Sequence, residues 1–220
     1  MKYSFLLMIP FLMTACTDTE GSISGTEKEY QNLNAEKVGE ITHIETLFDD
    51  SNFNSSVEYG LLKELEVCDT VNVEGSKCAL CTPKYFKLHP FNEHKALSNA
   101  FMLQVKALTV MKGQEAPLPM RHLIVFEREN GSLVKVNGFR GNLIATRVSE
   151  SGIKDLIIRF YIPNEGAFMN CLFVWDSGKY TFKSVESIDG AGGHGSVKAS
   201  VKTAVSKEVY QTLMSNAMLF

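Results

Sequence analysis

Cys78 and Cys81 form the pattern in this sequence with the clearest chemical potential. The segment Cys78-Ala79-Leu80-Cys81 could cycle between a dithiol and a disulfide if one thiol had a lowered pKa. A redox pair of this kind sits at the start of a helix that follows a buried strand. Here Thr82-Pro83 follows the pair and the polar residues 74–77 precede it, so the pattern favours structural cysteines over redox catalysis.

The first sixteen residues indicate the compartment in which these cysteines function. Lys2 supplies a positive charge, residues 5–13 are apolar, and small residues follow, which is the layout of a secretory signal. The apolar run is too short to span about 30 Å of hydrocarbon as a helix, and Pro10 interrupts it. We therefore expect an exported protein without a permanent transmembrane helix.

The end of this signal, Met13-Thr14-Ala15-Cys16, resembles the lipobox of bacterial lipoproteins. Met13 departs from the pattern, because leucine is usual at its position. The resemblance implies that Cys16 is lipidated and becomes the new N-terminus, so that the membrane is a partner through several acyl chains. The absence of aspartate at Thr17 implies the outer membrane, on its periplasmic face or at the cell surface, rather than the inner membrane.

Four cysteines remain beyond Cys16, and an even number in an exported chain predicts disulfides. Three connectivities are possible, and the sequence alone does not choose among them. A bridge from Cys68 to Cys78 or to Cys81 would close a turn between two strands. Cys171 would then pair with the remaining cysteine or stay buried as a thiol.

A metal site is the third interpretation of the same cysteines. Cys68, Cys78 and Cys81 could bind zinc together with His89 or His94. The paired CxxC spacing that would make a zinc site convincing is missing, and no histidine follows the second cysteine as haem attachment requires. We predict neither a metal nor a cofactor.

No other motif predicts catalytic residues. Residues 190–195 are glycine-rich and include His194, but a strand-like segment follows them, so a mobile hairpin loop is favoured over a phosphate-binding loop. Neither GxSxG nor HExxH is present. Four charged residues fall within the predicted meander: Arg140, Arg147, Asp155 and Arg159. If Arg159 points to the covered face with Asp155 or Glu127 nearby, it forms either a buried pair or a recognition site, but a solvent-facing arginine is favoured.

Length and composition indicate one globular domain. The chain has 220 residues, 45% of them hydrophobic, and its net charge of −3 gives no electrostatic footprint for nucleic acid. We predict a signal peptide over residues 1–15, a lipidated N-terminus and flexible tether over 16–36, and a single mainly-β domain over 37–220.

Alternating apolar residues and turn signals predict a mainly antiparallel meander sheet. Residues 38–50 suggest an edge strand, and 57–67 could be strand or short helix. The remaining predicted strands are 84–89, 100–111, 121–127, 133–139, 143–148, 155–161, 169–175 and 179–185. The strand 169–175 is apolar on both faces, so we expect it to be central.

The end of the chain predicts a helix that covers one face of the sheet. Residues 189–196 are expected to form a loop and 197–205 a last strand. Ser206 then has the character of a helix N-cap. Apolar residues follow it at helical spacing: Val209, Tyr210, Leu213, Met214 and Ala217. The predicted fold class is α+β, mainly β, with this helix packed on the sheet.

These observations favour a membrane-anchored envelope lipoprotein with a non-catalytic binding or accessory role. Its ligand, a protein or a small molecule, is unknown. One alternative is an envelope thiol-disulfide enzyme, or another enzyme, that uses Cys78 and Cys81. Another is an inhibitor or immunity-type protein that binds a single protein target.

Overall fold

The computed structural model describes residues 37–48, 56–68, 80–91, 97–106, 121–190 and 193–220. The predicted signal peptide, Cys16 and the tether lie outside the described residues, as do Cys78 and His94. No helix among the described residues is long and apolar enough to cross a membrane. The elements are β1 (Ile41–His43), α1 (Ser56–Glu64), β2 (Phe86–Pro90), β3 (Ala100–Val105), β4 (His122–Glu129), β5 (Ser132–Phe139), β6 (Asn142–Arg147), β7 (Asp155–Ile162), a 3-10 helix (Pro163–Glu165), β8 (Ala167–Asp176), β9 (Lys179–Gly190), β10 (Gly193–Ser196) and α2 (Ala199–Ser215).

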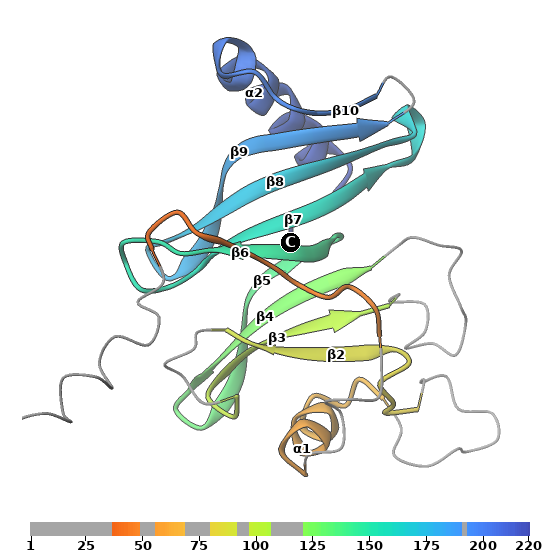
Figure 1. The fold of residues 1–220 in the computed structure, drawn as a ribbon. Coiled ribbons are helices and arrows are strands. Elements are labelled where there is room, and N and C mark those ends of the chain that lie inside the picture. Colours follow the sequence, from red (N-terminus) through yellow and green to blue (C-terminus); the bar gives the residue numbers. More distant parts are fainter. Residues whose placement is uncertain (1–36, 49–55, 69–79, 92–96, 107–120, 191–192) are drawn as a thin grey trace, which may run out of the picture. The chain divides into compact units, whose positions relative to one another are not determined.

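The strands form two antiparallel sheets (Figure 1). The six-stranded sheet has the order β1-β6-β7-β8-β9-β10, and the four-stranded sheet has the order β2-β3-β4-β5. The predicted fold class is confirmed: the domain is mainly β and antiparallel, and the C-terminal helix α2 packs against the larger sheet. The six strands predicted between residues 121 and 185 exist, but the first two belong to the smaller sheet and the other four to the larger one.

The main core lies between the two sheets and includes the inner side of α2. In β3, Ala100 and Met102 point into this core. Phe101 and Leu103 point to the opposite face, where α1 covers them and builds a second apolar cluster. Because both faces of β3 are covered, every residue in it is buried. Residues 57–67, for which the sequence allowed either a strand or a short helix, contain most of the helix α1.

The strand β8 is central and buried on both faces, as predicted. Cys171 and Phe173 face the main core, and Leu172 faces the other side of the sheet against Ala145 and Ile157. All five side chains are at most 8% exposed. A strand that is apolar in both parities therefore lies inside its sheet, with neighbours on both edges.

Gln104 ties the two sheets together where the chain passes from β5 to β6. Its side-chain amide donates to the carbonyl oxygens of His122 (3.0 Å) and Gly141 (3.1 Å), and its Oε1 accepts from the N–H of Leu143 (3.1 Å). The side chain is 2% exposed, so these bonds replace water for three backbone groups. Gln104 thus fixes the position of the crossover.

The predictions for residues 189–205 are only partly correct. The expected hairpin loop at 189–196 is a hairpin, but its arms are strands: the end of β9 pairs with β10. The expected strand at 197–205 is wrong, because this segment is largely the first half of α2. Ser206 is no N-cap: it is buried within the helix, and its hydroxyl accepts from the N–H of Val185 at 3.0 Å. The buried residues Ser206, Val209 and Leu213 follow one another at spacings of three and four, as on one helix face.

Candidate ligand-binding groove

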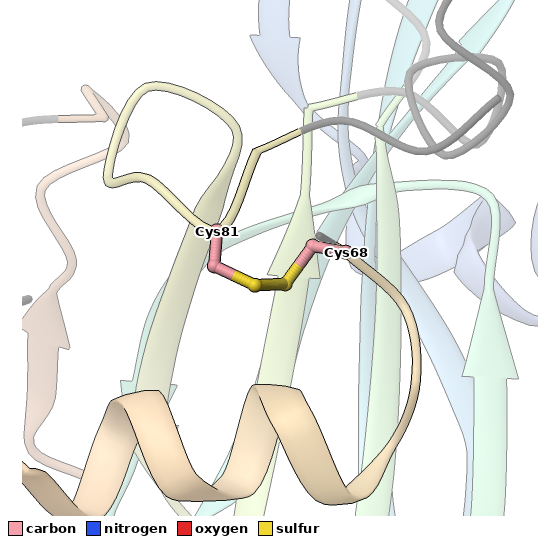
Figure 2. Close-up of a disulfide and its surroundings, with 2 residues drawn as sticks. All are labelled: Cys68 and Cys81. Atoms are coloured by element: carbon pink, nitrogen blue, oxygen red, sulfur yellow. A yellow bond between two sulfur atoms is a disulfide. The ribbon is translucent and has the colours of Figure 1, made fainter. Parts of the chain in front are cut away.

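The cysteines form a structural bridge. Cys68, in the coil that leaves α1, is joined to Cys81, in the turn before β2, with the Cα atoms 5.1 Å apart (Figure 2). Both residues are below 9% exposed and belong to the cluster under α1. The expectation of a disulfide is confirmed, and the bridge joins Cys68 to Cys81, which is one of the pairings that the sequence left open.

This bridge holds α1 against the smaller sheet. Because Cys81 is bonded to Cys68, it is not bonded to Cys78. A buried bridge of this kind argues against thiol exchange at the CxxC segment. Cys171 is a buried thiol in the centre of β8, and burial raises its pKa far above the usual range. Such a thiol is inert at neutral pH.

The residues considered for a metal do not meet in the part of the chain that the structure describes, where no group of three histidine, cysteine or acidic residues could hold an ion. His89 lies on β2, and burial, with a smaller contribution from Lys87, lowers its pKa to about 4. This histidine is therefore neutral at pH 7.

Two of the charged residues flagged in the strands form an ion pair. Arg147 on β6 and Asp155 on β7 approach to 2.6 Å, and the Asp155 side chain is 6% exposed. Arg159 does not contact Asp155; its Nε donates to Asn170 Oδ1 at 2.9 Å, and its guanidinium lies 3.5 Å from Asp189. Among the described residues, the pair considered for Arg159 and Asp155 is therefore not formed, and Asp155 pairs with Arg147 instead.

A groove of about 950 Å³ opens between α2, β5 and β9. One wall is a face of α2 from Ala199 to Met214, and the other is formed by residues 136–139 of β5 and the first half of β9. Leu219 and Phe220, which follow α2, also line the groove. Sequence reasoning did not predict this groove.

The floor of the groove is aromatic and aliphatic. Phe139 and Phe173 form its base, and both are fully buried. Above them, three large apolar side chains remain substantially exposed: Tyr210 (41%), Met214 (51%) and Phe220 (46%). Adjacent exposed apolar side chains that line one hollow are typical of a ligand or partner site.

The rim of the groove is basic. Four lysines line it, and the described part of the chain contributes no acidic residue to the lining: Lys179, Lys183, Lys202 and Lys207. Lys202 is paired with Glu186 at 2.7 Å. Among the described residues, the other three lysines have no ion-pair partner, so they are available to a negatively charged ligand.

The segment 218–220 is fixed to β5 by backbone hydrogen bonds. The N–H of Phe220 donates to the Gly138 carbonyl, and the N–H of Arg140 donates to the Met218 carbonyl, both at 2.8 Å. The Phe220 ring lies so close to Gly138 that a Cβ there would come within 2.3 Å of it. With any larger residue at 138, the Phe220 ring would have to move from this position.

One sequence signal did point to this groove. Tyr210 and Met214 were assigned to the buried stripe of the helix, but only Val209 and Leu213 of that stripe are buried, and Ala217 lies beyond the end of α2. An apolar stripe wider than the packed face is the signal that sequence reasoning missed. No protein family, curated protein or solved structure matches this chain.

Proposed function

We propose that the protein is a lipid-anchored binding module of the bacterial cell envelope, held at the outer membrane through Cys16. Its groove takes an amphipathic ligand that has an apolar acyl chain and a negatively charged headgroup. The observation that carries this proposal is the combination of an apolar floor with a rim of four lysines, without a carboxylate among the described residues that line the groove.

The chemistry of the groove supports this ligand class. An apolar chain would cover the exposed surface of Tyr210, Met214 and Phe220, at a gain of roughly 25 cal/mol for each Å² removed from water. A carboxylate or phosphate head would meet the lysines at the rim. A volume of about 950 Å³ is at the upper end of ordinary small-molecule sites.

The anchor rests on the sequence of the first sixteen residues. Two or three acyl chains on Cys16 would hold the domain almost irreversibly at the membrane, which is also the source of acyl-chain ligands. Mass spectrometry of the N-terminal peptide, from protein purified out of native membranes, tests this part. An unmodified Cys16, or an N-terminus elsewhere, would remove the anchor from the proposal and leave the groove.

The groove is tested by photolabelling the full-length protein with a diazirine derivative of oleate. We expect labelled peptides to map to α2 and to residues 218–220, and unlabelled oleate to compete better than oleyl alcohol, which lacks the negative charge. The double variant Lys183→Glu/Lys207→Glu should bind more weakly. At about 0.2–1 kcal/mol for each exposed pair, the loss is roughly 2- to 30-fold.

Lys198→Glu is the matched control, because Lys198 is an exposed lysine beside the same helix and does not line the groove. Its labelling should equal that of the wild-type protein. Labelling spread over the whole surface, or unchanged in the double variant, would contradict the proposal.

A further inference from the structure

A second, smaller pocket lies where the chain crosses from β5 to β6, with a volume of about 210 Å³. Three arginines line it: Arg121 at the start of β4, Arg140 at the crossover and Arg159 on β7. No acidic residue is among the described residues that line it. Three positive charges around one small cavity are unusual in a chain whose net charge is −3.

The guanidinium of Arg121 is held in place by neutral groups. It donates to the Thr46 carbonyl and, at 3.5 Å, to Asn142 Oδ1, and it lies over the Phe48 ring at 4.9 Å. Burial lowers its pKa, and none of its partners among the described residues is a carboxylate. A half-buried cation without a counter-ion is costly, and an anion in the pocket would offset that cost.

Arg159 enters the pocket from the face of the larger sheet. Asn170 accepts from its Nε at 2.9 Å, and Phe168 supports the guanidinium through a ring contact at 5.8 Å. Asp189 lies 3.5 Å from its Nη2 and is the one carboxylate that the structure places in contact with any of the three arginines. A positive excess remains within the described part of the pocket.

The backbone at the crossover fixes the third arginine. At Gly141, an added Cβ would come within 2.9 Å of the Arg159 carbonyl oxygen, so only glycine allows the crossover to lie this close to β7. Gln104 holds the Gly141 carbonyl, and Met218 accepts from the N–H of Arg140. The Arg140 side chain is exposed and has no ion-pair partner among the residues described.

We propose that this arginine pocket, formed by Arg121, Arg140 and Arg159, binds a phosphate group, either inorganic phosphate or the phosphate monoester of a larger molecule. Guanidinium groups bind phosphate oxygens with paired, charge-assisted hydrogen bonds. Three guanidiniums from three elements match a tetrahedral dianion better than a carboxylate, which offers two oxygens. The cavity is too small for a long acyl chain, so this inference does not depend on the groove.

The test is isothermal titration calorimetry on the full-length protein at low ionic strength, with inorganic phosphate and with acetate as the reference anion. We expect phosphate to bind at one site and acetate to bind more weakly. Arg140→Gln should weaken phosphate binding at least about tenfold, because it removes charge-assisted hydrogen bonds. The variant should unfold at the wild-type temperature, since no ion pair is lost.

Arg128→Gln is the matched control, because Arg128 lies at the opposite end of β4 and pairs with Glu64 on the surface. It should bind phosphate as the wild-type protein does. Absence of phosphate binding, equal binding of acetate, or equal losses in the two variants would overturn the proposal.

Glycerol 3-phosphate separates the two sources of the phosphate. Tighter binding of this ester than of inorganic phosphate supports an esterified ligand such as a lipid headgroup. The reverse order supports free phosphate. Either order of affinity supports the arginine pocket only if the Arg140→Gln variant loses the binding.

Discussion

The bridge between Cys68 and Cys81 makes a quantitative prediction about stability. The two cysteines are 13 positions apart in the sequence, so the bridge closes a loop of about 14 residues. The chain-entropy treatment assigns about 3 kcal/mol to a loop of this size, through the freedom that the bridge removes from the unfolded chain. In a domain of 150–250 residues, each kcal/mol shifts the melting temperature by about 2–4 °C, so removal of the bridge should lower it by about 6–12 °C.

The double substitution Cys68→Ala/Cys81→Ala is the appropriate change, because a single substitution would free a thiol that could pair with Cys78. Circular dichroism follows the thermal unfolding of the variant and of the wild-type protein, with and without reductant. The reduced wild-type protein should melt close to the double variant. Cys78→Ala is the control and should melt as the wild-type protein does.

Two results would refute this reasoning about the bridge. If the double variant melted within about 2 °C of the wild-type protein, the bridge would not contribute as a closed loop. If Cys78→Ala lost as much stability as the double variant, the connectivity in solution would involve Cys78. In that case, redox exchange at the CxxC segment would become the leading interpretation of the cysteines.

Two further predictions concern the crossover between the sheets. Gln104→Leu removes the side-chain hydrogen bonds to three backbone groups and should lower the free energy of unfolding by about 3 kcal/mol in urea titrations. The exposed Gln211→Leu should change it by less than about 0.5 kcal/mol. Burial, with a smaller contribution from Arg140, lowers the pKa of His122 to about 4. Between pH 6.5 and 4, the His122 imidazole is protonated in the unfolded chain but neutral in the folded protein. The free energy of unfolding should therefore fall as the pH is lowered through this range. His89, whose pKa is lowered to the same value, contributes to this fall as well, so His122→Gln should reduce its slope by about half in urea titrations at several pH values; an unchanged slope would contradict the assignment.

These strands were predictable because both of their faces are covered by apolar clusters. β3 and β4 send successive residues to the main core and to the cluster under α1, so each strand appears in the sequence as a continuous apolar run. The division into two sheets was not predictable. The crossover at Arg140-Gly141 has the composition of an ordinary turn, and only the packing of Gly141 against β7 distinguishes it from a hairpin.

The first half of α2 was assigned to a strand because its valines and lysines alternate over a short distance. Ala199, Lys202 and Ala204 are also good helix formers, and tertiary contacts decided between the two structures. Val201 is 48% exposed, whereas Val197 and Val205 pack against the main core, so only part of this valine set is buried. Burial, which the sequence does not show, resolved the ambiguity.

Both candidate sites lie beside positions that sequence propensity would count as weak. Gly138 and Gly141 interrupt the apolar alternation at the end of β5, and glycine is unfavourable in a strand. In the structure, Gly138 admits the Phe220 ring at one wall of the groove, and Gly141 lets the chain cross close to β7 at the arginine pocket. Segment 218–220 contributes Met218 to the pocket and Phe220 to the groove. The residues that weaken the strand are therefore the ones that make room for the two sites, which is where a fold is expected to depart from its local preferences.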